Sequence, residues 1–95
     1  MEKFNWNYPT TMWIGENRIN DLNLACENLG INKPLLVTDN ALSKTKIITD
    51  ALEILKKKNI FVEIFSNVVG NPTGQNVSDG VDFLKKKNCD GIIAF

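Results

Sequence analysis

Two segments of the chain repeat one pattern, in which a run of lysines closes a stretch with helical spacing and a short apolar run follows. Residues 55–60 read LKKKNI, and residues 84–89 read LKKKNC. The runs that follow, 61–65 and 91–95, have the length of strands. Strands that alternate with helices form parallel sheets with right-handed crossovers, so the repeat predicts an α/β fold of successive βα units.

The stretch before these units fits the same pattern. Apolar residues at helical spacing predict a short amphipathic helix, which Asn20 or Asp21 would cap at its start and Gly30 would end. Its apolar residues are Ile19, Leu22, Cys26 and Leu29. The run 34–38 is too short for a helix and is typical of a strand buried on both faces.

Two further helices follow from apolar stripes. One stripe consists of Ile47, Ile48, Ala51, Leu52 and Leu55, and the other of Val77, Val81 and Leu84. Gly80 lies inside the second stripe, where a glycine costs up to about 1 kcal/mol against alanine, so it predicts close contact with the sheet. The lysine triplets favour solvated helix ends that complement the helix dipole, with a polyanion patch as the alternative. The last run, 91–95, reads as a buried strand.

The N-terminal residues 4–15 are rich in aromatic and turn-forming residues. Phe4, Trp6 and Tyr8 alternate with polar residues, and the run 12–14 is apolar. This alternation around Pro9 predicts short edge strands or a hairpin. The hairpin would either cover the edge of the sheet or pair with a second copy of the chain as a dimer.

Composition excludes several classes of function. Eleven basic residues balance eleven acidic ones, so no broad field attracts nucleic acid or a membrane surface. We expect no membrane span, no secretory signal and no disulfide between Cys26 and Cys89, which together indicate a cytoplasmic protein. Histidine is absent, which excludes Ser-His and Cys-His catalysis and the commonest transition-metal ligand. We therefore expect no complete reaction from this segment alone.

Asp39 is the first candidate for a binding residue, because it ends the run 34–38. A carboxylate at the end of such a strand accepts hydrogen bonds from the ribose hydroxyls of a dinucleotide, and it would repel a 2′-phosphate by a few kcal/mol. That arrangement favours NAD over NADP. The alternative is that Asp39 only starts a turn, through Asn40, Ser43 or nearby amides.

Asn71 is the second candidate, in a tight loop that follows the next strand. Its amide can both donate to and accept from a ligand, while Thr73 can cap the next helix. The alternative is a turn-forming asparagine. The loop 70–74 is neither a P-loop nor a dinucleotide fingerprint, so a pyrophosphate cradle would have to lie beyond Phe95. The sequence reads as the opening piece of a nucleotide-binding domain.

The order and spacing of these pieces resemble the N-terminal part of the iron-containing alcohol dehydrogenases, a group that includes lactaldehyde reductase and butanol dehydrogenases. The resemblance spans nearly all of the chain, and its pieces are the hairpin ending at Gly15, the strand 36–39, the loop 71–73 and the approach 89–94. Gly70 departs from the family, in which many members carry proline before the Asn-Pro-Thr run.

The resemblance implies that Asp39 and Asn71 line an NAD(P) site. It implies a doubly wound, Rossmann-like parallel sheet in which residues 1–95 form a partial NAD(P)-binding domain. The family's Gly-Gly-Gly-Ser pyrophosphate loop and its helical domain, which supplies an aspartate and three histidines to iron or zinc, would then be absent. The complete enzyme would transfer hydride between NAD(P) and a small alcohol or aldehyde. A self-contained, receiver-like binding module is the alternative, but it would need clustered carboxylates, and only Asp39 is so placed.

Overall fold

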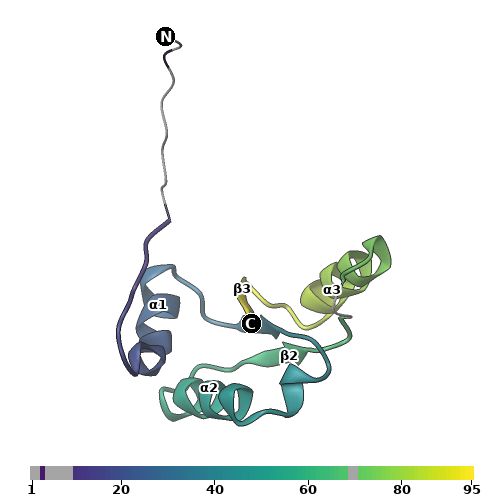
Figure 1. Cartoon of the computed structure of the whole chain (residues 1–95). Coiled ribbons are helices and arrows are strands. Elements are labelled where there is room, and N and C mark those ends of the chain that lie inside the picture. Colours follow the sequence, from purple (N-terminus) through teal and green to yellow (C-terminus); the bar gives the residue numbers. More distant parts are fainter. Residues whose placement is uncertain (1–2, 4–9, 69–70) are drawn as a thin grey trace.

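The computed structural model describes residue 3 and residues 10–68 and 71–95 of the chain. Within these residues three strands form one sheet, with helices between them (Figure 1). The elements are η1 (Arg18–Asp21), α1 (Leu22–Asn28), β1 (Pro34–Val37), η2 (Leu42–Lys44), α2 (Lys46–Lys57), β2 (Glu63–Phe65), α3 (Gly74–Lys86) and β3 (Gly91–Ala94). None of the helices in this part of the chain is long and apolar enough to span a bilayer.

The sheet is parallel, with the strand order β2-β1-β3. Leu36 of β1 lies opposite Ile64 of β2 and Ile93 of β3. Beyond the strands, the Thr38 N–H donates to the carbonyl of Phe65 at 3.1 Å, and the Phe95 N–H donates to the carbonyl of Val37 at 3.0 Å. The α/β fold and the parallel sheet that the sequence predicts are confirmed, with β1 as the central strand.

Side chains on the two faces of the sheet build two separate cores. On one face Leu36 packs with Ile48 and Ala51 of α2, all fully buried, and Leu22 of α1 packs against them. On the other face Leu35 packs with Phe65 and Cys89, and partly buried residues of α3 pack against them. Figure 1 accordingly shows α1 and α2 on one side of the sheet and α3 away from them.

The three α-helices end in the same way, and the repeated lysine pattern is part of two of these ends. The residue after each C-cap has a positive φ: 69° at Gly30, 59° at Asn59 and 56° at Asn88. The next N–H then reaches back over the last turn, as in the bond from Ile60 to Leu55 at 3.0 Å and the bond from Cys89 to Leu84 at 3.0 Å. These are Schellman motifs, in which asparagine takes the place that glycine has at Gly30.

Hydrogen bonds of Asp90 connect the start of β3 to the start of β1. Its carboxylate accepts hydrogen bonds from the backbone N–H of Asn32 at 2.9 Å and of Lys33 at 2.8 Å, and its own N–H donates to the Lys33 carbonyl at 3.0 Å. These backbone donors stabilise the charged form and lower the pKa of Asp90 below its ordinary value. Next to it, Gly91 leaves no room for a side chain, because a Cβ there would lie 2.6 Å from Ile31.

The structure corrects several expectations about the N-terminal region. Of the expected hairpin, residues 4–9 lie outside the described part of the chain, and 12–14 form no strand. A 3₁₀ turn precedes α1, and Asp21 makes no capping hydrogen bond from its side chain but pairs with Arg18 at 3.1 Å. α1 begins at Leu22, so Asp21 occupies the predicted N-cap position without a capping bond, and Ile19 lies in the preceding 3₁₀ turn.

Other corrections concern burial. Ile47 is 60% exposed although it was placed in the apolar stripe of α2, and β2 begins at Glu63, which leaves Phe61 outside the strand and 63% exposed. No residue of α3 is buried, so the stripe that begins at Val77 faces open space along part of its length. β3 alternates between half-buried and exposed residues instead of being buried, because it lies at the edge of the described sheet.

Candidate functional site

The carboxyl ends of β1 and β2 lie at one edge of the sheet, because the two strands are parallel neighbours. Asp39 follows directly after Thr38 at this edge, and Asn71 lies in the connection that leads from β2 to the start of α3. Crevices beyond the carboxyl ends of parallel strands are where open α/β sheets bind ligands. The fold thus brings the two predicted site residues to the same edge, in loops after neighbouring strands.

The carboxylate of Asp39 is half-buried and holds the turn that follows β1. Its Oδ1 accepts a hydrogen bond from the Leu42 N–H at 2.6 Å, and its carbonyl accepts one from the Ser43 N–H at 3.0 Å. The turn-forming role that the sequence left open is therefore present. The hydrogen bonds of the described residues use only Oδ1, which leaves Oδ2 as an acceptor for a ligand.

Thr38 is a residue that the sequence reasoning did not single out. It is 2% exposed, and its Oγ1 is the buried side-chain oxygen without a hydrogen-bond partner in the described part of the chain. An unpaired hydroxyl in an apolar environment costs about 1–3 kcal/mol. No simple sequence signal marks it, because Thr38 reads as the last residue of an apolar strand.

The start of α3 is held by a reciprocal capping box. Thr73 Oγ1 accepts from the Asn76 N–H at 3.2 Å, and Asn76 Oδ1 accepts from the Thr73 N–H at 3.1 Å. The predicted capping role of Thr73 is confirmed, whereas Asn76 was missed. The signal was present in the sequence as a threonine followed three residues later by a side-chain amide, which is one form of the capping box.

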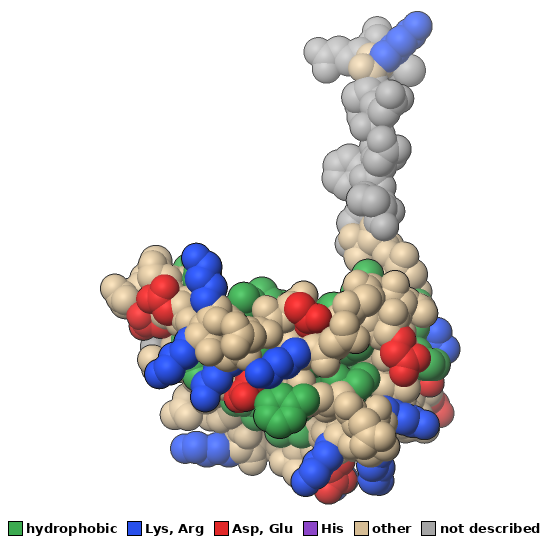
Figure 2. Space-filling model, turned by 180° about the vertical axis from the view of Figure 1, so that it is seen from behind, with side chains coloured by type: hydrophobic (Ala, Val, Ile, Leu, Met, Phe, Trp, Pro, Cys, Tyr) green, Lys and Arg blue, Asp and Glu red, His purple; other side chains and the backbone are tan. Residues whose placement is uncertain are grey.

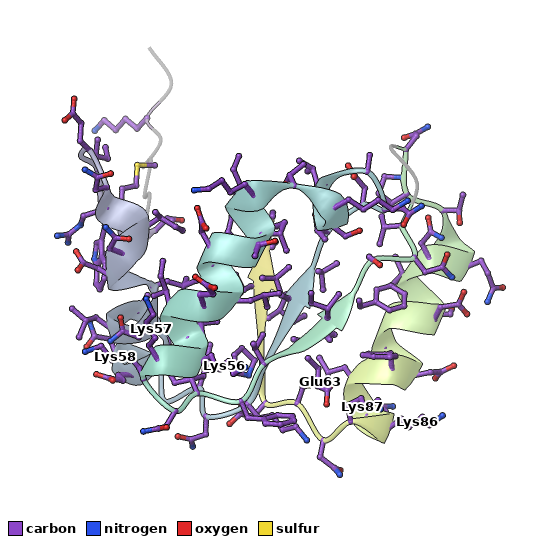
Figure 3. The ribbon with its side chains drawn as sticks, turned by 90° about the horizontal axis from the view of Figure 1, so that it is seen from below. Lys56, Lys57, Lys58, Glu63, Lys86 and Lys87 are labelled. Carbon is purple, nitrogen blue, oxygen red and sulfur yellow. The ribbon has the colours of Figure 1, made fainter. Side chains whose placement is uncertain are left out.

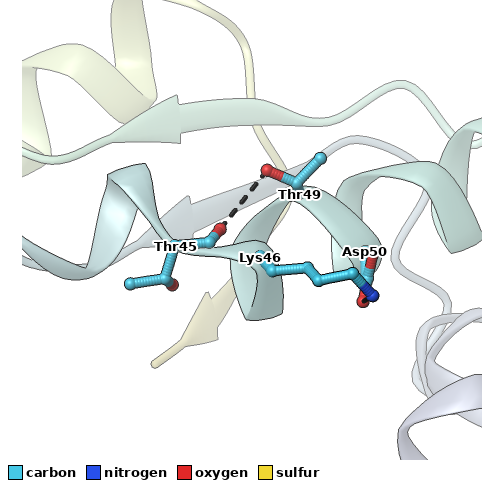
Figure 4. Close-up of polar contacts among 4 residues, drawn as sticks. All are labelled: Thr45, Lys46, Thr49 and Asp50. Carbon is cyan, nitrogen blue, oxygen red and sulfur yellow. Dashed lines mark hydrogen bonds and ion pairs between the residues drawn. The ribbon is translucent and has the colours of Figure 1, made fainter.

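The start of α2, at the same edge, is built differently (Figure 4). The Thr45 hydroxyl donates back to the Leu42 carbonyl at 2.7 Å instead of capping the helix, and the Thr45 carbonyl accepts from Thr49 Oγ1 at 3.3 Å. Lys46, the first residue of α2, pairs through its ammonium with Asp50 one turn later at 3.1 Å on the surface. The Asp50 carboxylate at this end of α2 is paired with Lys46, whereas the Asp39 carboxylate lies directly after β1.

The two lysine triplets lie at the opposite edge of the sheet. Figure 3 shows Lys56 to Lys58 at the end of α2 and Lys86 and Lys87 at the end of α3, with Glu63 between the two groups. Basic and acidic side chains are interspersed on the face drawn in Figure 2. This arrangement fits solvated helix ends better than a single patch for a polyanion.

Nucleophiles and metal ligands are few in the described residues. Cys26 and Cys89 are free and buried, and burial raises the pKa of each thiol above its ordinary value, so neither is an activated nucleophile. No cluster of three or more acidic or cysteine side chains suited to a metal ion is found in these residues. The described residues of the carboxyl edge thus offer polar groups, the Asp39 carboxylate and the Asn71 amide, to a ligand.

Comparison with known proteins decides the family. Residues 9–95 match the family described as iron-containing alcohol dehydrogenase. The chain belongs to this family. It is 35% identical to the choline dehydrogenase of Bacillus subtilis (strain 168) over 95 residues, and 35% identical to the 1,3-propanediol dehydrogenase of Klebsiella pneumoniae over 92 residues. The resemblance inferred from the sequence is confirmed.

Solved structures show the same fold in members of the family. A 1,3-propanediol oxidoreductase matches 98% of this chain with a TM-score of 0.91 at 34% identity. The NADH-dependent butanol dehydrogenase A of Thermotoga maritima matches 97% of it with a TM-score of 0.85 at 28% identity. The comparisons give no support to a receiver-like module.

The matched region is a fraction of each relative. The chain spans 24% of the length of the choline and propanediol dehydrogenases and 24% of the propanediol oxidoreductase chain, while 99%, 95% and 98% of this chain are covered. The 95 residues thus correspond to about a quarter of these family members.

Proposed function

We propose that this chain forms the adenosine-facing part of the NAD site of a metal-dependent alcohol dehydrogenase. The proposal rests on one observation above the others: in a member of this family, the central strand ends in a half-buried carboxylate with one oxygen left for a ligand. The complete enzyme would act on a small alcohol or aldehyde, with hydride supplied or accepted by the nicotinamide.

Asp39 would bind the adenosine ribose. Oδ1 is occupied by the Leu42 N–H, so Oδ2 would accept from the ribose hydroxyls while the turn keeps the carboxylate in place. A 2′-phosphate at the same place would meet like charge, at a cost on the order of a few kcal/mol in a partly buried site. The proposal therefore names NAD as the cofactor and NADP as the weaker alternative.

Asn71 would bind the cofactor from the neighbouring loop. Its side chain is exposed at the carboxyl edge, and its amide can donate to and accept from polar groups of the dinucleotide. Together with Asp39 it would contact only the adenosine side, because the chain has no glycine-rich phosphate loop.

The residues that the structure describes do not fit a metal ion. The sequence contains no histidine, and the described residues hold no suitable cluster of acidic and cysteine side chains. Iron, or zinc as the alternative, would need ligands from elsewhere in a complete enzyme. We further propose a cytoplasmic location and, through the N-terminal segment, a homodimer.

The decisive experiment is the exchange of Asp39 for asparagine in the complete enzyme. Asp39→Asn keeps an oxygen for the Leu42 N–H but removes the charge, so the preference for NAD over NADP should fall by about tenfold or more, the equivalent of 1.4 kcal/mol. Ser43→Ala in the same turn is the control, since it leaves the carboxylate in place. An unchanged cofactor preference in Asp39→Asn would remove Asp39 from the ribose site.

A second measurement concerns the chain by itself. Purified Met1–Phe95 should show no alcohol dehydrogenase activity with NAD and added iron or zinc, because it lacks histidine and a phosphate loop. Metal-dependent oxidation of an alcohol by this material would contradict the assignment of the chain to the cofactor side alone.

A further inference from the structure

We propose that Asn76 is a positioning residue that sets the place of Asn71 in the cofactor site. The inference rests on the proposed function, since it assumes that Asn71 contacts NAD. Asn76 itself lies in the first turn of α3 and need not touch the cofactor. Its side chain hydrogen-bonds the backbone of Asn67 and of Thr73, which lie on either side of Asn71 in the sequence.

The contacts of one side chain carry this inference. Asn76 Oδ1 accepts from the Thr73 N–H at 3.1 Å, and Asn76 Nδ2 donates to the Asn67 carbonyl at 3.4 Å. Asn67 precedes Asn71 in the connection between β2 and α3, and Thr73 follows it. The carboxamide therefore ties the two ends of this connection to each other and to the helix.

The hydrogen bonds on either side of Asn71 matter because no described residue holds Asn71 directly by a hydrogen bond. Its residue is exposed, and the hydrogen bonds of the described residues do not include Asn71. Asn71 lies two residues before Thr73, whose N–H donates to Asn76 Oδ1 at 3.1 Å. A displacement of about 1 Å in a binding group is enough to weaken a ligand contact markedly.

The chemistry of the amide separates this role from helix capping. Capping needs only an acceptor for the Thr73 N–H, and a carboxylate supplies one and also favours the positive end of the helix. The bond to the Asn67 carbonyl needs a donor, which a carboxylate lacks. Asn76→Asp should therefore keep the bond from the Thr73 N–H that caps the helix and lose the bond to the Asn67 carbonyl.

The test measures NADH affinity in the complete enzyme carrying Asn76→Asp, with Ser78→Asp as the charge control in the same region of α3. Loss of one hydrogen bond should raise the dissociation constant of NADH about fivefold in Asn76→Asp relative to the control. The KM for NAD should rise in parallel while kcat stays within about twofold, because no reacting group changes. Equal NADH affinity in the two variants would overturn the inference.

A second pair keeps the test independent of how Asn76→Asp folds. Asn76→Gln and Asn76→Glu have the same length and differ in the donor, so Gln should bind NADH more tightly than Glu. Amide exchange of Asn71 should also be faster in the carboxylate variants than in Ser78→Asp. Unchanged exchange would count against the tie.

The two proposals fail differently. If the wild-type enzyme binds no NADH, the proposed function is wrong. If it binds NADH with the same affinity in the amide and carboxylate variants, only the role of Asn76 is wrong.

Discussion

The two faces of the sheet differ in how completely they are covered. On the α2 face, Leu36, Ile48 and Leu55 are each 0% exposed. On the α3 face, Val77 is 63% exposed and Ile92 of β3 is 58% exposed. The face under α2, the closed face, is thus covered more completely at its centre than the face under α3, the open face.

The open face carries a groove of about 280 Å³ between α3 and the sheet. Its lining is almost entirely apolar and includes Leu35, Val37, Phe65, Val81, Leu84 and Ile92. The two faces show that an apolar stripe predicts which side of a helix faces the sheet. The stripe does not predict how deeply that side of the helix is buried. Because burial of apolar surface is the main source of stability, we expect α3 to open more readily than α2.

Truncation of Leu36 should have the largest effect on stability. Leu36→Ala removes a fully buried side chain from the closed face and should lower the free energy of unfolding by about 2–5 kcal/mol. Val81→Ala, at a position 45% exposed on the open face, should cost less than about 1 kcal/mol because alanine also favours the helix. Urea unfolding of Met1–Phe95 measures both.

The control for Leu36→Ala is a smaller deletion on the same face. Ile48→Val should lower the free energy of unfolding by only about 0.5–1.5 kcal/mol, so it keeps the closed face testable even if Leu36→Ala proves too unstable to measure. Equal losses for Leu36→Ala and Val81→Ala would show that the two faces contribute equally, contrary to the comparison.

A pair of glycines gives the second test. A Cβ at Gly91 would lie 2.6 Å from Ile31, so Gly91→Ala should destabilise the chain by about 1–3 kcal/mol through overpacking. At Gly80 the nearest atom is Cε1 of Phe65 at 3.4 Å, and alanine is the better helix former by about 1 kcal/mol. Gly80→Ala should therefore be neutral or slightly stabilising.

Thermal unfolding of the two glycine variants measures the difference. If Gly80→Ala were as damaging as Gly91→Ala, α3 would be packed as tightly on the sheet as β3 is packed on Ile31, and the open face would be less tolerant than described.

Much of the fold could be predicted because its signals are local. The repeated lysine pattern predicts the βα units. Gly80 predicts close contact with the sheet, and Phe65 of β2 lies next to it. The strand order and the unequal faces could not be predicted, because they depend on which side of β1 each connection takes. Asn59 and Asn88 were read only as the residues after lysines, although their positive φ is what ends the helices.

The candidate site was predicted in part. Asp39 and Asn71 come to one edge, as parallel strands require, but their roles toward a cofactor stay predictions. Thr38 and Asn76 were missed for different reasons. The burial of Thr38 depends on tertiary packing, whereas the bond from Asn76 to Asn67 needs the connection to fold back on α3.

Asp90 gives the third and smallest test, because it connects the segment between α3 and β3 to the segment just before β1. It joins the turn after α3 to the backbone of Asn32 and Lys33, just before β1. Asp90→Ala should remove this connection and speed amide exchange in α3 and β3 more than in α2. Asp50→Ala, which removes a surface ion pair on α2, is the control.

The pH dependence of this connection has a defined sign. The backbone donors of Asn32 and Lys33 lower the pKa of Asp90 in the folded chain. Its contribution is therefore present above the ordinary aspartate pKa of about 3.9 and is lost as the pH falls through the lower, folded value. The difference in melting temperature between wild type and Asp90→Ala should be constant from about pH 7 to pH 5 and shrink toward pH 3. A difference as large at pH 3 as at pH 7 would contradict this prediction. It would mean that the ionised form of the Asp90 carboxylate is not what connects the start of β3 to the start of β1.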